Sequence, residues 1–191
     1  MPGARVVVAA GFFVIDAVAA GCSPAASVCE QKNSIIDVRA WRFVDPADDV
    51  VWPAPGDAAL CGPDDVQVQP IGDALALEID TRLGCGWATA TQPTLRDLRV
   101  GDRLQTQVFY FPQSTFPTAQ ADVAIAIDDE IVLSEVLAIP APSGLLQPVI
   151  TIDRDIDAGA AVQFHIGNHG DNSWNLVELA VVTSVGCDDV D

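Results

Sequence analysis

The chain has 191 residues, of which 50% are hydrophobic, and its 27 acidic against 9 basic side chains give a net charge of −18. This charge repels nucleic acid and anionic lipid surfaces, so it excludes a nucleic-acid partner. The apolar fraction excludes a disordered chain, and the length is that of one domain with an N-terminal extension.

The first 21 residues have the pattern of a signal peptide. Arg5 precedes an apolar run over residues 6–15, which is shorter than the ~20 apolar residues needed to span a bilayer. Small residues then lead to Cys22. We therefore expect a cleaved export signal over residues 1–21.

Residues 19–22, Ala-Ala-Gly-Cys, resemble the lipobox of bacterial lipoproteins. The resemblance implies that Cys22 is acylated, as by palmitate, and that a lipid anchor ties the protein to a membrane of the cell envelope. Ser23 after the cysteine favours the outer membrane or the cell surface. Residues 17–19, Ala-Val-Ala, also fit an ordinary secretory signal, which would give a secreted or periplasmic protein, and an uncleaved anchor is the third alternative.

Five cysteines occur in the chain, and lipidation of Cys22 would leave an even number. Four cysteines are enough for two disulfides in an exported protein. Three pairings are open on the sequence alone. We favour one local loop and one link between the two ends of the domain, which are Cys61–Cys85 and Cys29–Cys187.

After the signal, residues 22–33 are expected to form a polar tether, residues 34–187 a folded domain and residues 188–191 an acidic tail. Residues 45–72 contain five prolines and are expected to be irregular, with at most a short strand over 66–68. The Asp128-Asp129-Glu130 segment reads as a three-residue hairpin turn. Alternating apolar and polar residues predict further strands over 35–44, 74–80, 86–91, 103–111, 121–127, 131–139, 148–153, 160–166 and 174–185.

No segment has a sustained helical period, and turn residues separate the strands. These features predict an all-β fold, a single antiparallel β-sandwich of about eight or nine strands with a long irregular N-terminal excursion. The Gly101-Asp102 turn, the 157–159 turn, residues 162–166 and residues 168–180 resemble the galactose-binding-like jelly roll. That resemblance covers residues 98–185 and implies a jelly roll of the kind found in carbohydrate-binding modules.

The 168–174 loop is the candidate ligand-binding site. It offers amide, imidazole and carboxylate groups for sugar hydroxyls and an indole ring for the apolar face of a sugar. A purely structural loop is the alternative, because Asn and Gly suit turns and the tryptophan can pack into the core. The candidate ligand-binding residues are Asn168, His169, Asp171, Asn172 and Trp174.

The sequence offers little for a metal or a catalytic centre. Acidic turns could supply oxygens to a structural Ca²⁺, but residues 153–164 lack the glycine and glutamate of an EF-hand loop, and turn formation explains the same residues. The His165, His169 and Asp171 set is a weak metal candidate. No cofactor is predicted.

Motifs of hydrolases, nucleotide-binding proteins and zinc peptidases do not occur in the sequence. The sequence therefore favours an exported, non-catalytic ligand-binding lipoprotein of the envelope, with a glycan as ligand. The first alternative is a structural or protein-interaction module that meets another envelope protein, and the second is a secreted hydrolase.

Overall fold

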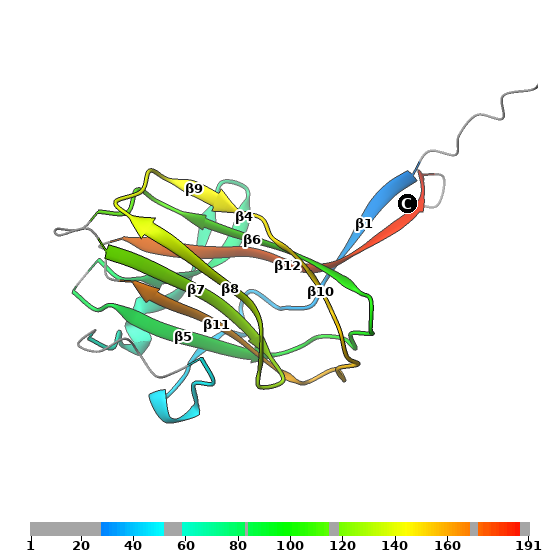
Figure 1. Cartoon of the computed structure of the whole chain (residues 1–191), viewed down its shortest axis with the longest axis horizontal. Helices are drawn as coiled ribbons and strands as arrows, with labels where there is room; N and C mark the ends of the chain where they lie inside the picture. The colour runs from blue at the N-terminus through cyan, green and yellow to red at the C-terminus, as the bar shows by residue number, and fades with distance from the viewer. Residues whose placement is uncertain (1–27, 52–58, 83, 115–118, 169–171, 188–191) are drawn as a thin grey trace, which may run out of the picture.

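The computed structural model describes residues 28–51, 59–82, 84–114, 119–168 and 172–187. Over these residues the chain forms strands β1 to β12 and two 3-10 helices, η1 (Pro46–Asp48) and η2 (Pro63–Asp65). Two antiparallel sheets face each other, which confirms the predicted β-sandwich (Figure 1). Within the described ranges, no helix has the length and hydropathy to cross a membrane.

The larger sheet has seven strands in the order β10-β6-β12-β4-β3, with β1 paired to β12 and β9 paired to β6. Strand β12 is the longest and lies at its centre. The strands are β1 (Val28–Ser34), β3 (Val66–Ile71), β4 (Ala74–Asp80), β6 (Arg103–Tyr110), β9 (Gly144–Leu146), β10 (Val149–Thr151) and β12 (Ser173–Gly186).

The smaller sheet has five strands in the order β2-β5-β11-β7-β8. Figure 1 shows β5, β11, β7 and β8 side by side in front of the larger sheet. The strands are β2 (Arg42–Phe43), β5 (Trp87–Pro93), β7 (Ala119–Ile127), β8 (Glu130–Ile139) and β11 (Ala161–Asn168).

The core lies between the sheets and follows the two-residue period of the strands. In β4, Leu77 and Ile79 are fully buried, as are Phe164 and Ile166 in β11. Successive side chains of a strand point to opposite faces. The residues between these core positions, such as His165, therefore lie on the outer face of their sheet.

The N-terminal part of the domain differs from the prediction. Residues 28–33, expected in the tether, belong to β1, which pairs with β12 from Val28↔Gly186 to Ser34↔Ala180. Beyond Val182, β12 has β1 as its described partner, and the two strands form a ribbon that projects from the sandwich (Figure 1). The predicted signal peptide, Cys22 and the acidic tail lie outside the described residues.

Two disulfides have the pairing favoured from the sequence. The Cys29–Cys187 bond joins the far ends of β1 and β12, with Cα atoms 4.9 Å apart. The Cys61–Cys85 bond joins the segment before β3 to the segment before β5, with a Cα–Cα distance of 4.8 Å.

The strand predicted over residues 35–44 is wrong except for β2. The backbone N–H of Ala40 donates to the carbonyl of Asp37 at 2.9 Å, and the N–H of Arg39 donates to the Asp37 carboxylate at 2.9 Å. This local capping by an aspartate competes with strand formation. Residues 37–40 therefore turn the chain and interrupt the alternation.

The β7–β8 hairpin also differs in detail. Its turn has two residues, Asp128 and Asp129, with φ of 54° and 64°, while Glu130 already belongs to β8. A two-residue turn with positive φ at both positions matches the right-handed twist of the strands.

The predicted turns at Gly101 and Gly159 are present, and each glycine has a φ of 90° that other residues rarely adopt.

Candidate functional site

The loop chosen from the sequence is only partly described. His169 and Asp171 lie outside the described residues, and Asn168 is described only as the last backbone position of β11. Asn172 has a structural role, because its side chain donates to the carbonyl of Pro112 and its own carbonyl accepts the N–H of Thr81 at 2.9 Å.

The prediction that Trp174 presents its ring to a ligand is wrong. Trp174 is 0% exposed, and its ring lies against Tyr110 with a centroid distance of 5.0 Å. In the register of the larger sheet it faces Ile79 on one side and Tyr110 on the other. Trp174 is therefore a core residue, and its ring cannot stack on a sugar.

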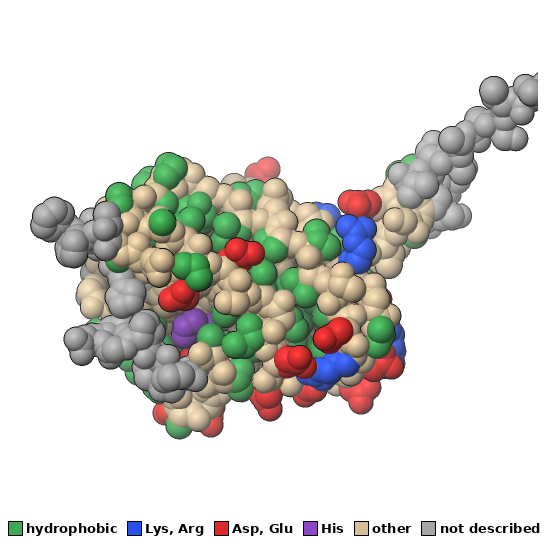
Figure 2. All heavy atoms as spheres, viewed as in Figure 1, with side chains coloured by type: hydrophobic (Ala, Val, Ile, Leu, Met, Phe, Trp, Pro, Cys, Tyr) green, Lys and Arg blue, Asp and Glu red, His purple; other side chains and the backbone are tan. Residues whose placement is uncertain are grey.

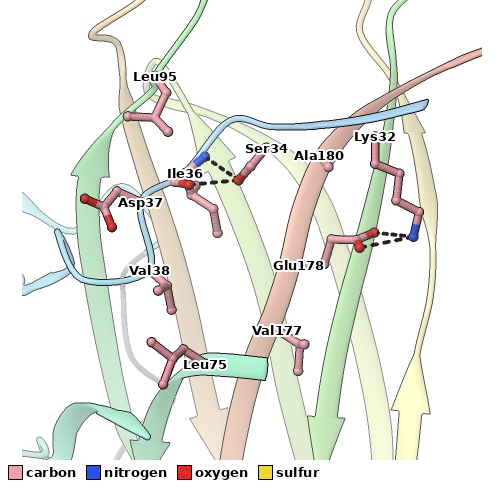
Figure 3. Close-up of a pocket in the computed structure, with 10 residues that line it drawn as sticks. All are labelled: Lys32, Ser34, Ile36, Asp37, Val38, Leu75, Leu95, Val177, Glu178 and Ala180. Carbon is pink, nitrogen blue, oxygen red and sulfur yellow. Dashed lines mark hydrogen bonds and ion pairs between the residues drawn. The ribbon is translucent and has the colours of Figure 1, made fainter. Parts of the chain in front are cut away.

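A groove lies where β12 changes its partner. On one side, β12 pairs with β4 only from Ser173 to Leu176, and with β1 only from Ala180 onward. A β-bulge in its pairing with β6 falls between Leu176 and Glu178. The residues between the two partners leave the sheet open at this point, and a groove of about 690 Å³ results (Figure 3).

The groove combines an apolar surface with charged sides. Figure 3 shows Asp37 on one side and the Lys32–Glu178 pair on the other. The Lys32 Nζ lies 2.9 and 3.1 Å from the two Glu178 carboxylate oxygens. Apolar side chains lie between these groups: Ile36, Val38, Leu75, Leu95, Val177 and Ala180.

The charges of the groove are accessible to a ligand. The side chains of Lys32 and Glu178 are 38% and 25% exposed, and a surface pair of this kind contributes little to stability. An apolar surface with a few polar groups at its sides is the usual chemistry of a small-ligand site. The sequence analysis missed this groove because its residues come from β1, β4, β12 and two loops.

A second polar cluster lies on the outer face of the five-stranded sheet. The Thr89 hydroxyl donates to the Asp49 carboxylate, and the His165 Nδ1 lies 2.6 Å from the Thr89 Oγ1 and 3.2 Å from the Asp49 Oδ2. The Asp49 side chain is 0% exposed and that of His165 is 5% exposed. The cluster fastens the segment that follows β2 onto β5 and β11.

Gln163 supports the same segment from β11. Its amide donates to the carbonyl of Asp48 at 3.0 Å and accepts the N–H of Val50 at 3.1 Å. Gln163 and His165 are two residues apart on the outer face of β11. The segment from Asp48 to Val50 is therefore held by side chains that a strand alternation places outward.

Burial and hydrogen bonding shift the pKa of the Asp49 carboxyl in opposite directions. Burial raises the pKa of its carboxyl. Hydrogen bonds from His165 and Thr89, the electrostatic attraction of His165 and the hydrogen bond from the Val51 N–H together lower it by more, so the pKa lies below the ordinary 3.8. Asp49 is therefore ionised at neutral pH, and its charge is compensated by hydrogen-bond donors.

We expect Asp49→Asn to reduce the free energy of unfolding by about 1–3 kcal/mol at pH 7. The NH2 group of the asparagine would replace one carboxylate oxygen and would then face a hydrogen-bond donor. Because the folded pKa is lowered, the contribution of Asp49 is full above its unfolded pKa and is lost as the pH falls through the folded value. Urea unfolding from pH 7 down to pH 3 should show the two proteins converging in stability. Asp48→Asn, at an exposed position, is the control, and a difference that stays constant to pH 3 contradicts the prediction.

Among the described residues, the potential ligand atoms of three or more His, Cys, Asp or Glu side chains converge only at Cys61, Asp65 and Cys85. The disulfide uses both sulfur atoms. This group is therefore a covalent link beside a carboxylate and offers no thiolate to a metal.

Comparison with known proteins gives a likeness of fold. No family model matches the chain, and no curated protein matches it. Among solved structures, the carbohydrate-binding module TmCBM27, described as recognising mannan, has a TM-score of 0.50 and 10% identity, with 81% of this chain and 98% of that chain covered.

Two further structures have lower scores. An arabinose-bound GH51 α-L-arabinofuranosidase has a TM-score of 0.47 and 8% identity over 80% of this chain and 26% of the enzyme, so the chain spans about a quarter of the enzyme's length. A CBM4 structure has a TM-score of 0.39 and 11% identity over 76% and 95% of the two chains. The chain thus shares the two-sheet jelly-roll fold of carbohydrate-binding modules.

Proposed function

We propose that this protein is a non-catalytic glycan-binding module. The observation that carries the proposal is the likeness to TmCBM27, a mannan-recognising module that is matched over 98% of its length. The chain therefore has the extent of a whole binding module. A fold alone does not fix a function, so the proposal also rests on a surface with suitable chemistry.

The groove of Figure 3 is the proposed glycan site. Its apolar side chains suit the C–H face of a sugar ring, while Lys32, Glu178 and Asp37 offer a hydrogen-bond donor and acceptors to the hydroxyls at its two sides. A neutral glycan also suits a protein of this net charge, because it does not have to approach against repulsion.

We also propose that the module is exported and anchored by a lipid at Cys22. The support is the sequence pattern of Arg5, residues 6–15 and residues 19–22. Intact-mass measurement of the membrane-extracted protein tests it. A mass that begins at Cys22 and carries acyl chains is expected, and a mature N-terminus at Ala20 without lipid contradicts it.

Removing the ion pair of the groove should weaken glycan binding. We expect the double substitution Lys32→Ala and Glu178→Ala to lower the affinity at least tenfold, about 1.4 kcal/mol, for the polysaccharide that the protein binds best. Both charges are removed together, so neither is left without its partner. A glycan array and then isothermal titration calorimetry with soluble mannan and xylan oligosaccharides measure the effect.

The control removes a surface ion pair away from the groove, Arg154 after β10 with Glu130 of β8. The Arg154 Nε lies 2.7 Å from the Glu130 carboxylate, and its Nη1 lies 2.7 Å from the exposed Asp128 carboxylate. This variant should bind like the wild type. Failure of the folded wild-type protein to bind any glycan on the array overturns the proposed function, and equal binding by the groove variant overturns the assignment of the site.

A further inference from the structure

Gly167 leaves a small notch on the outer face of the five-stranded sheet. In the register of this sheet, Gly167 of β11 pairs with Trp87 of β5 on one side and Asp122 of β7 on the other. A Cβ atom at Gly167 would lie 3.5 Å from the His165 Nε2 and 3.7 Å from the Asp122 Oδ2. The missing side chain therefore leaves a space that a ring nitrogen and a carboxylate oxygen both border.

The buried contacts of His165 determine what its Nε2 offers to this space. The Thr89 hydroxyl donates to Asp49, so the Thr89 oxygen is free to accept the Nδ1–H of His165, and the Asp49 Oδ2 lies within reach of the same proton. With the proton on Nδ1, the Nε2 is a hydrogen-bond acceptor whenever the ring carries a single proton. No described residue makes a hydrogen bond to Nε2, although the whole side chain is 5% exposed.

Trp87 provides an aromatic wall beside the notch. The ring of Trp87 lies 6.3 Å from that of His165, centroid to centroid, and is tilted by 30°. On the other side of His165, its partner in β7 is the small Ala124. Figure 2 views the molecule from this side and shows a histidine side chain at the surface.

We propose that the notch above Gly167 is a second sugar-binding position, which accepts hydroxyl hydrogens of a neutral glycan through the His165 Nε2 and the Asp122 carboxylate. Two acceptors and an aromatic wall select a ligand that donates hydrogen bonds, and they disfavour a carboxylate or phosphate. The ligand class rests on the proposed function. The position does not, because the groove lies at the opening beside β12 in the other sheet.

Gly167→Ala fills the notch without removing any polar group. The distances of 3.5–3.7 Å from its Cβ are ordinary van der Waals contacts, and the backbone at Gly167 is not in the left-handed region. The variant is therefore expected to keep the wild-type Tm and to lower the affinity at the notch at least tenfold. Asp122→Asn, which exchanges one acceptor for a donor, should lower it as well.

The control is Gly62→Ala, at a second glycine where the added Cβ would meet only the Asp65 carboxylate at 3.8 Å. Titration calorimetry of all four proteins with manno- and xylo-oligosaccharides, with and without EDTA, tests the proposal. Loss of one binding site in Gly167→Ala and Asp122→Asn, with the groove site retained, supports it. Wild-type affinity and stoichiometry in both variants overturn the proposed notch site and leave the proposed function intact. Binding at the notch that EDTA abolishes also overturns the notch site, because a metal would then occupy it. Absence of glycan binding by the wild type overturns the proposed function itself.

Discussion

Trp174→Ala is expected to reduce the free energy of unfolding by about 3–5 kcal/mol, as large-to-small substitutions of buried aromatic residues do. The ring is fully buried between β4 and β6 and contacts Tyr110, so its removal leaves a cavity that the two sheets cannot close. Chemical unfolding followed by circular dichroism measures the change.

Trp174→Phe is the matched control, because it retains an aromatic ring in the same place and should cost clearly less. A Trp174→Ala protein as stable as the wild type would falsify the assignment of this residue to the core. The expected instability also affects binding assays. Loss of glycan binding in Trp174→Ala is informative only where the variant is shown to be folded under the assay conditions.

Removing the Cys29–Cys187 disulfide by a double Cys→Ser substitution should destabilise the domain more than removing Cys61–Cys85. The two bonds join residues 158 and 24 positions apart. Loop-closure entropy in the unfolded chain then gives about 5 kcal/mol for the long loop and about 3.5 kcal/mol for the short one. The order arises although Cys29–Cys187 lies at the end of a ribbon and Cys61 is buried in the core.

Thermal unfolding of the two double variants, beside the wild type with and without reductant, measures this order. Equal Tm values for the Cys29→Ser/Cys187→Ser variant and the wild type would contradict the loop argument. They would show instead that the ribbon opens before the sandwich does, as a local unfolding unit.

The strands that alternate strictly were predictable from the sequence. In β6 every second residue from Leu104 to Tyr110 is buried, and in β4 the apolar Leu77 and Ile79 are two positions apart in the core, so local pattern and tertiary environment agree. Strand β1 was not predictable in this way, because residues 30–33 are all polar. Its conformation follows from pairing with β12, whose partner residues are about 150 positions away.

The candidate sites depend on similar long-range contacts. The groove exists because β12 exchanges β4 for β1, and no local pattern records such an exchange. Asp49 and His165 meet across 116 positions. The sequence did contain one usable signal, since His165 lies between two core residues of a predicted strand and must therefore point outward. The same two-residue alternation places Trp174 and Leu176 on one face of their strand, which indicated that Trp174 points into the core with Leu176.

The disulfide at the end of the β1–β12 ribbon has a mechanical consequence. Tension applied to the chain before Cys29 and after Cys187 passes directly through their disulfide, since this bond connects the two exit points covalently. The 157 residues between the cysteines, with both sheets and both candidate sites, then carry no load along the backbone. Under reducing conditions the same tension would instead separate β1 from β12, one residue pair after another. A domain of this design transmits tension from one chain end to the other without loading its fold, as long as the disulfide is intact.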